Sequence, residues 1–407
     1  MTTLEASAKA EAPPIHDTAF AILAALSMCH LLNDMMQSLL PSIYPILKES
    51  YRLDFAQIGY ITLAFQLTAS LLQPAVGMFT DRRPLPYSAA VGMGLTVTGL
   101  ALLATAHSYP VILCAAACVG IGSSIFHPES SRVARLASGG RHGFAQSIFQ
   151  VGGNVGSAIG PLLAALIILP NGQKSVAWFM VAGFLAMALL TYVGRWYATH
   201  GTRRLKSGGI SIANVAHLSR ARIVGSIAVL VALVFSKFFY MASLSNYLTF
   251  YLIETFGVSI HTAQLYLFVF LAAVAAGTFL GGPIGDRIGR KYVIWFSILG
   301  VFPFTLALPH ANLFWTLILA SIAGLILASA FSAIIVYAQE LIPGRTGMIA
   351  GLFFGLAFGM GGLGAAVLGE IADLTSIGFV YQICAFLPLI GLITWFLPNI
   401  EGSRRKR

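Results

Sequence analysis

Apolar residues run through this sequence in long, nearly unbroken blocks that are separated by short polar stretches. A helix needs roughly 20 consecutive apolar residues to cross a hydrocarbon core of about 30 Å. Strands of membrane barrels instead alternate apolar and polar residues over about ten positions, and these blocks do not alternate. The pattern therefore predicts an all-α membrane protein with twelve transmembrane helices, at residues 19–47, 55–79, 86–106, 109–137, 142–169, 174–198, 221–255, 261–282, 291–308, 311–340, 345–373 and 376–398.

The composition agrees with this pattern. Hydrophobic residues make up 57% of the 407 residues and charged residues only 9%, whereas soluble domains carry about 25% charged residues. No cleavable signal peptide is visible, because the first eighteen residues are mixed and polar. All four cysteines lie inside apolar blocks, and we expect free, buried thiols there.

The basic residues are distributed unequally between the loops. If both termini are cytoplasmic, that side holds 20 of the 24 Lys and Arg residues. The opposite side holds Lys48, Arg52 and Lys174, and Lys237 falls inside the seventh helix. Cytoplasmic loops of membrane proteins carry such an excess. The net charge of +10 therefore reflects topology, and we expect no nucleic acid partner.

The two halves of the chain contain similar loops. Gly77, Asp81 and Arg82 recur as Gly282, Asp286 and Arg287 at an offset of 205 residues, and Arg141-His-Gly143 recurs as Arg345-Thr-Gly347 at 204. Parallel six-helix repeats are a known transporter architecture. We predict two pseudo-symmetric six-helix bundles, with a cytoplasmic tail at 1–18, bundles at 19–198 and 221–398, a cytoplasmic linker at 199–220 and a basic cytoplasmic tail at 399–407.

Three segments carry a family resemblance. The loop from Gly282 to Lys291 reads G-x-x-x-D-R-x-G-R-K and resembles the signature of the major facilitator superfamily. His30-Leu-Leu-Asn33-Asp34 and Phe126-His-Pro-Glu-Ser130 are similar to the fosmidomycin-resistance branch of that superfamily. The resemblance covers the whole chain. It implies a drug–proton antiporter that exports a phosphonate antibiotic.

The first helix carries a polar face. His30, Asn33, Asp34 and Gln37 recur at i, i+3, i+4 and i+7, so they share one side of the helix. An ionisable residue inside a membrane is costly and marks a functional site by default. We interpret His30 and Asp34 as proton-coupling residues and Asn33 and Gln37 as substrate-binding residues. A structural hydrogen-bond network is the alternative.

The fourth helix carries His127, Pro128, Glu129 and Arg132. His127 and Glu129 point about 200° apart on an ideal helix, so they share a cavity only if Pro128 distorts the helix. We interpret His127, Glu129 and Arg132 as proton-coupling residues. The alternative is a static Glu129–Arg132 pair that closes the cytoplasmic end.

The fifth helix carries two amides and a small-residue motif. We expect Gln150 and Asn154 to lie beside the substrate. Gly156, Gly160 and Pro161 resemble the G-x-x-x-G-P core of an antiporter motif in this superfamily, although Ala164 replaces its usual final glycine. Close packing of helix backbones explains the glycines equally well.

The seventh helix places Lys237 at mid-depth, with Tyr240 and Tyr247 along the same face. A lysine there needs a counter-ion. We predict that Lys237 pairs with Asp34 in the empty transporter and with an anionic substrate otherwise, because lysine binds phosphate-like groups as a point charge. Tyr240 and Tyr247 are predicted to bind substrate as well.

The repeated loops suggest a mechanical role. Asp81 and Asp286 lie where a carboxylate can cap a neighbouring helix N-terminus, and Arg82, Arg287 and Arg290 can pair with acidic groups. By resemblance, these loops with Gly77 and Gly282 gate the transporter, and the second copy is the better preserved. The remaining acidic residues near helix ends, expected to be interfacial, are Glu254, Glu340, Glu370 and Asp373.

These features predict a proton-coupled exporter of small anionic or amphipathic drugs in the bacterial inner membrane. Uptake or exchange of an organic anion or sugar phosphate is the alternative within transport, and an intramembrane enzyme is a weaker one. No nucleotide-binding loop or hydrolase motif occurs. A third metal ligand beside His30 and Asp34 is not identifiable. We therefore expect no enzyme activity, cofactor or metal, and a monomer whose partners are substrate, protons and lipids.

Overall fold

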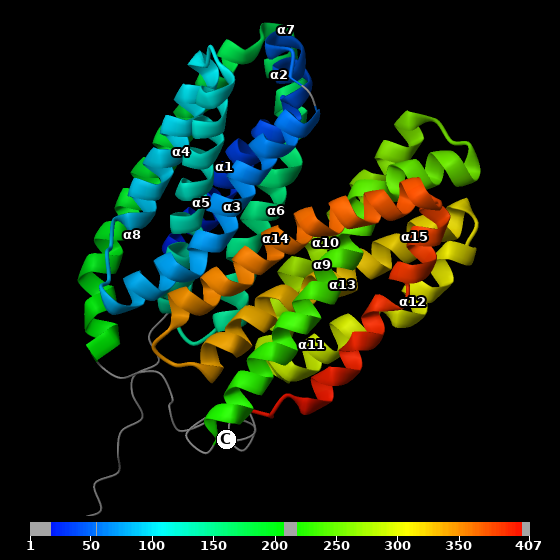
Figure 1. The fold of residues 1–407 in the computed structure, drawn as a ribbon. Helices are drawn as coiled ribbons and strands as arrows, with labels where there is room; N and C mark the ends of the chain where they lie inside the picture. Colours follow the sequence, from blue (N-terminus) through cyan, green and yellow to red (C-terminus); the bar gives the residue numbers. More distant parts are fainter. Residues whose placement is uncertain (1–17, 54, 207–217, 401–407) are drawn as a thin grey trace, which may run out of the picture.

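A computed structural model describes residues 18–53, 55–206 and 218–400, and within these ranges the chain forms helices and no strands (Figure 1). Twelve helical segments are long and apolar enough to span a membrane, which confirms the predicted number. The first half contains α1 (Phe20–Ser42), α2 (Tyr44–Tyr51), α3 (Phe55–Arg82), α4 (Ser88–Thr105), α5 (Tyr109–Ala137), α6 (His142–Leu163), η1 (Ala164–Ile168), α7 (Leu169–Asn171), η2 (Gln173–Phe179) and α8 (Met180–Lys206). The second half contains α9 (Arg220–Phe256), α10 (Ile260–Ile288), α11 (Arg290–Leu299), α12 (Phe302–Ala307), η4 (Leu308–His310), α13 (Leu313–Leu341), α14 (Thr346–Leu374), α15 (Ile377–Cys384) and η5 (Leu387–Phe396).

Several spans are less regular than predicted, and proline explains the breaks. The predicted first helix is divided at Ile43, between α1 with Pro41 in its last turn and α2 with a proline in its first. Pro161 lies three residues before the π-helical segment η1. Proline lacks an N–H and clashes with the preceding turn, so a continuous helix cannot pass through it undisturbed.

Two further predictions need correction. The sixth helix does not end at residue 198, because α8 continues to Lys206. The rest of the predicted linker falls mainly on residues 207–217, outside the described residues, as do nearly all of the two predicted tails. The four cysteines are free, but Cys114 is exposed and Cys118 half-buried, so only Cys29 and Cys384 are buried as expected.

The helices of the two halves pack in matching pairs. α1 packs on α6 as α9 packs on α14, and α3 packs on α5 as α10 packs on α13. Between the halves, α3 lies along α14 and α6 along α10, which is the contact expected of a two-fold arrangement (Figure 1). These contacts confirm the repeat that the loop sequences predicted.

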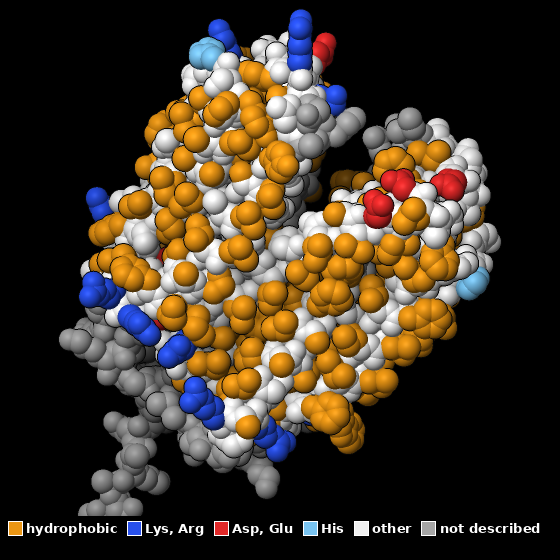
Figure 2. All heavy atoms as spheres, viewed as in Figure 1, with side chains coloured by type: hydrophobic (Ala, Val, Ile, Leu, Met, Phe, Trp, Pro, Cys, Tyr) orange, Lys and Arg blue, Asp and Glu red, His pale blue; other side chains and the backbone are white. Residues whose placement is uncertain are grey.

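The halves are joined at one end only. A single apolar core contains the first half together with residues of α13 and α14 such as Ile334 and Phe353. A second core lies entirely within the second half, around Tyr240 and Phe270. Figure 2 shows the surface hollowed between the halves at the opposite end. The closed end is formed by the C-termini of α3 and α10 and the N-termini of α6 and α14.

Candidate functional site

The polar face of α1 is buried, as its spacing predicted. The side chains of His30, Asn33, Asp34 and Gln37 are all less than a tenth exposed. Helix α1 packs along α6 and against α5 and α8, so this face looks into the first half. The predicted polar cluster therefore exists, and its partners come from neighbouring helices.

Asp34 lies between two imidazoles. Its Oδ2 is 3.3 Å from Nε2 of His30, and its Oδ1 is 3.5 Å from Nε2 of His127. The His30 Nδ1 lies 2.8 Å from the carbonyl oxygen of Phe149, and the His127 Nδ1 lies 3.0 Å from that of Ser123. Sequence reasoning missed this convergence because His127 comes from a different helix.

The donor atoms of this triad, His30, Asp34 and His127, lie within 4.8 Å of one another. His127 thus supplies the third donor that could not be identified from the sequence. Catalytic zinc sites use three such donors but keep a fourth position open for water or substrate, and here phenylalanine rings occupy much of the surrounding wall. Asn33 donates one hydrogen bond to Asp34 Oδ1 at 3.0 Å. The donor set suits a proton better than a metal ion.

Glu129 lies in a separate ion-pair cluster toward the closed end. Arg132 donates hydrogen bonds to the Glu129 carboxylate and to the carbonyl oxygen of Thr80. Ser88 Oγ donates to Glu129 Oε2 at 3.0 Å, and Arg132 lies 3.8 Å from Asp81. His127 and Glu129 thus face different partners, as an undistorted helix predicted. The static pair considered for Glu129 and Arg132 is formed in this structure.

Lys237 is buried at 4% exposure but has no ion-pair partner among the described residues. Its Nζ lies 4.8 Å from the ring centroids of both Phe238 and Phe331. The predicted ion pair between Asp34 and Lys237 is therefore not formed. Aromatic faces attract the ammonium but leave its hydrogen-bond donors for another group.

The other predicted substrate residues lie in different settings. Gln150 is buried, and its carbonyl oxygen has no hydrogen-bond partner in the described part of the chain. Asn154 donates to Thr278 on α10 at 3.0 Å, so it joins the two halves. Tyr240 lies in the core of the second half, and the Tyr247 hydroxyl donates to the carbonyl oxygen of Ala365 on α14 at 2.6 Å.

The glycine motif of α6 forms a packing seam against α1. A Cβ atom added to Gly156 would overlap the carbonyl oxygen of Leu31, and one added to Gly160 would overlap Ser38 Oγ. Small residues four apart allow such close approach. Gly153 lies on the same seam, and its Cβ would come within 2.8 Å of Asp34 Oδ2. The motif thereby holds α1 and α6 together beside the triad.

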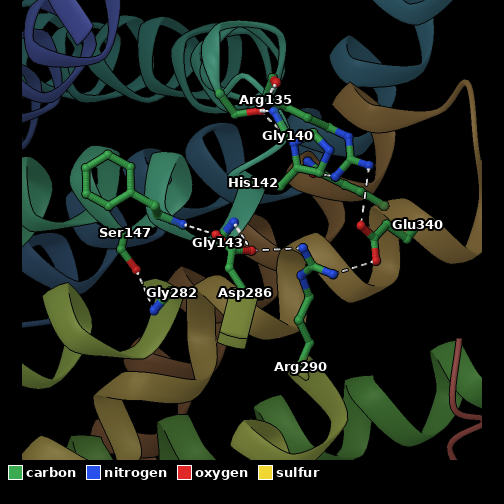
Figure 3. A network of polar contacts seen from close by, with 12 residues as sticks. Arg135, Gly140, His142, Gly143, Ser147, Gly282, Asp286, Arg290 and Glu340 are labelled. Carbon is green, nitrogen blue, oxygen red and sulfur yellow. Dashed lines mark hydrogen bonds and ion pairs between the residues drawn. The ribbon is translucent and has the colours of Figure 1, made fainter. Parts of the chain in front are cut away.

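Asp81 and Asp286 each cap a helix of the opposite half, as predicted. Asp81 accepts main-chain N–H bonds from Gly347 and Met348, at 2.9 and 2.8 Å. Asp286 accepts the matching bonds from Gly143 and Phe144, both at 2.9 Å (Figure 3). The Ncap residues of α6 and α14 offer no side-chain cap, so these carboxylates satisfy the free N–H groups instead.

The glycines of the two loops permit this contact. A Cβ atom on Gly77 would overlap the carbonyl oxygen of Gly347, and one on Gly282 would overlap that of Gly143. The Gly282 N–H also donates to Ser147 Oγ at 3.0 Å (Figure 3). The close approach of the halves therefore requires both glycines.

The basic residues of the loops do not all pair. Arg290 donates to Asp286 and to Glu340, both at 2.9 Å, and Arg135 lies 4.0 Å from Glu340 (Figure 3). The expectation of a merely interfacial Glu340 is therefore wrong. Arg82 and Arg287 are exposed and show no ion pair within the described residues.

Comparison with known proteins agrees with the fold and the loops. The sequence profile of the Major Facilitator Superfamily matches residues 26–353 and 229–407. The chain is 62% identical over 382 residues to the fosmidomycin resistance protein of Escherichia coli (strain K12), covering 94% of each chain. It is 42% identical over 388 residues to the uncharacterized MFS-type transporter YfnC of Bacillus subtilis (strain 168), covering 95% of each.

Solved structures of the same fold are similar at low sequence identity. The transporter FucP in its outward conformation has a TM-score of 0.72 at 18% identity, over 92% of this chain and 98% of that one. The human organic anion transporter MFSD10 has a TM-score of 0.69 at 19% identity, over 95% and 100%. The chain is thus a multi-pass transporter of the bacterial inner membrane, not an enzyme, and it belongs to the Major Facilitator Superfamily.

Proposed function

We propose that this transporter exports fosmidomycin-like phosphonates or other small anionic drugs in exchange for protons. The identity of 62% to a fosmidomycin resistance protein is the observation that carries the choice of export and of substrate class. The polar chemistry fits it. The buried triad offers a place for a proton, and the ammonium of Lys237, which has no ion-pair partner among the described residues, offers a place for an anionic group.

The proposed cycle is alternating access between the bundles 19–198 and 221–398. With both termini on the cytoplasmic side, as the loop charges predict, the closed end is cytoplasmic and the hollow faces outward. Asp81 and Asp286 would then stabilise the outward-facing state, since each bonds a helix of the other half. Opening the cytoplasmic side requires breaking both caps.

The test uses the full chain expressed in a fosmidomycin-sensitive bacterium. We expect growth in the presence of fosmidomycin, and loss of that protection when a proton uncoupler is added at a sublethal dose. Purified protein in liposomes should move protons when fosmidomycin is supplied on one side. Protection that persists without a proton gradient contradicts proton coupling, while sensitivity to fosmidomycin at normal expression contradicts the substrate class.

Uptake or exchange of an organic anion or sugar phosphate remains the second candidate. The buried Lys237 favours an anion of either kind. The two functions differ in direction. Everted vesicles energised with a proton gradient, acidic inside, should accumulate the exported drug, whereas an uptake symporter would not accumulate its substrate there.

A further inference from the structure

We infer that the triad His30, Asp34 and His127 is the proton-binding site of this transporter, and that Phe354 and Phe358 of the other half complete its wall. The inference rests on the proposed proton exchange. It goes further by choosing the triad over Glu129 and by making the site depend on contact between the halves.

The hydrogen bonds of the two imidazoles determine where their protons lie. A carbonyl oxygen only accepts, so the Nδ1 atoms beside Phe149 O and Ser123 O must each carry a proton. Ser123 Oγ also lies 3.3 Å from His127 Nδ1, but it donates its proton to Gln37 Oε1 at the shorter distance of 3.1 Å. A neutral imidazole has one N–H. Each Nε2 is therefore a bare acceptor unless its ring is cationic.

Asn33 donates to Asp34 Oδ1 at 3.0 Å, but no proton then lies between the carboxylate and either Nε2 atom. The two Nε2 atoms lie 3.3 and 3.5 Å from the Asp34 carboxylate, and the Nε2 of His127 has no hydrogen-bond partner. An unsatisfied buried acceptor costs about 1–3 kcal/mol. One added proton, shared between one imidazole and the carboxylate, replaces one of the two repulsive contacts with a charge-assisted hydrogen bond and leaves the triad neutral overall. The triad is built to hold that proton.

Glu129 has no comparable need. Its carboxylate already accepts a hydrogen bond from Arg132 and lies 3.0 Å from Ser88 Oγ, and Glu129 is 2% exposed. An arginine paired with a carboxylate satisfies both charges, so a proton there would displace a partner that is already present. Glu129 thus belongs to the support of the closed end, through Arg132 and its approach to Asp81.

The second half supplies one wall of the triad. The ring of His127 lies 5.1 Å from the rings of both Phe354 and Phe358 on α14, and that of His30 lies 6.3 Å from Phe354. Phe126 and Phe149 of the first half cover other sides. In the proposed cycle α14 moves away from α5 when the closed end opens, and the wall would then be lost.

The same phenylalanine separates the triad from Lys237. The Phe354 ring lies 5.5 Å from Phe331, whose ring lies 4.8 Å from the Lys237 Nζ. Movement of Phe354 would therefore affect both the proton site and the predicted anion site. Among the described residues, the other buried ionisable groups on the helices packed here are Cys29 on α1, Glu129 and Arg132, which pair with each other on α5, Tyr197 beside Arg132 on α8, Lys237, Tyr240 and Tyr251 on α9, and Tyr337 on α13.

The first experiment measures proton release by the purified full chain in weakly buffered detergent solution when fosmidomycin is added. We expect about one proton per protein from the wild type and from Glu129→Gln, and none from Asp34→Asn or His127→Gln. Release lost in Glu129→Gln but retained in Asp34→Asn overturns the assignment. Release that disappears after treatment with a chelator also overturns it, because the triad would then hold a metal ion.

This design separates the inference from the function on which it rests. If the wild type binds fosmidomycin without releasing a proton, the proposed exchange itself is wrong. If the wild type releases a proton and the triad variants do so too, exchange stands and the triad is not its site. Binding of fosmidomycin by each variant, measured by calorimetry, shows that the variant is folded.

The second experiment tests the wall by proton leak into liposomes without substrate. Phe354→Leu should raise the leak several-fold, because water reaches the triad from the closed end. Phe353→Leu is the matched control, since Phe353 is equally buried on α14 but has no ring contact with either imidazole among the described residues. Phe354→Tyr keeps the aromatic ring, and its proton leak should stay at the wild-type rate. Equal proton leak in the Phe353 and Phe354 variants would contradict the claim that Phe354 shields the triad from water.

Discussion

At the closed end the two halves are nearly interchangeable. Asp81 and Asp286 each accept two main-chain N–H bonds from the helix of the opposite half, at 2.8 to 2.9 Å. Gly77 and Gly282 allow the same close approach. At mid-depth the halves have little in common, because the first holds the triad and the second holds Lys237 between two rings.

The symmetric closed end therefore serves the conformational change, and the asymmetric buried residues serve the binding of ligands. Alternating access needs two bundles that meet along equivalent surfaces, and a repeat supplies these directly. The proposed exchange needs two different ligands, a proton and an anion, and two identical sites could not distinguish them. Substitutions at the symmetric and asymmetric positions should therefore have different effects: loss of exchange at mid-depth, and a shifted conformational equilibrium at the closed end.

The largest effect is expected for Asp34→Asn. The substitution keeps the shape and removes the charge that the two imidazoles surround, so proton-driven export should fall to the background of the empty vector. Fosmidomycin tolerance and uptake into everted vesicles measure it. Asp373→Asn, an exposed carboxylate on α14, is the control and should stay near wild type. Export within about twofold of wild type in Asp34→Asn would contradict the role of the triad.

The next largest effect is expected for Lys237→Gln. A hydrogen bond to a charged group contributes about 1.5–3 kcal/mol, so affinity for an anionic substrate should fall about ten- to a hundredfold. Binding measured by calorimetry and the concentration dependence of export report it. Lys237→Arg keeps the charge and should be milder. Unchanged export of the phosphonate by Lys237→Gln would exclude Lys237 as its partner.

A smaller effect, at the symmetric positions, is expected for Gly282→Ala. The added methyl group would overlap the carbonyl oxygen of Gly143, and overpacking costs about 1–3 kcal/mol. The closed end should open more often, which spin labels across it would detect as longer distances in a cysteine-free background. Gly225→Ala is the control, because a Cβ there meets nothing within 4 Å. Unchanged distances in Gly282→Ala would mean that the helices adjust without separating.

Much of this architecture could be predicted from the sequence, since the helices follow from apolar blocks and the two similar halves follow from repeated loops. The caps of Asp81 and Asp286 followed from the loops alone. The triad did not, because which face of α5 meets α1 is decided by helix packing. Phe354 gave no signal either, since a ring that walls a site and a ring that faces lipid look alike in sequence. The one available indication of the triad was Asp34 itself, because a carboxylate inside a transmembrane helix needs polar partners.

The predicted Asp34–Lys237 pair failed for a related reason. Both groups are buried, and a charge inside a transmembrane helix needs a partner. The sequence does not show that Phe354 and Phe331 stand between the two helices. Asp34 instead contacts the imidazoles of His30 and His127, and the Lys237 ammonium lies over an aromatic ring.

The smallest effect, and the finest test of the symmetry, compares Asp286→Asn with Asp81→Asn. Each variant loses a charge at a helix N-terminus, which is worth about 0.3–1 kcal/mol, or about a two- to fivefold change in turnover. Asp286 also has Arg290 at 2.9 Å, whereas Asp81 has Arg132 only at 3.8 Å, so Asp286→Asn should have the larger effect. Turnover and substrate affinity are measured separately, and affinity should stay unchanged. Lost binding at normal expression, or a larger effect from Asp81→Asn, would show that the caps do more than hold the halves together.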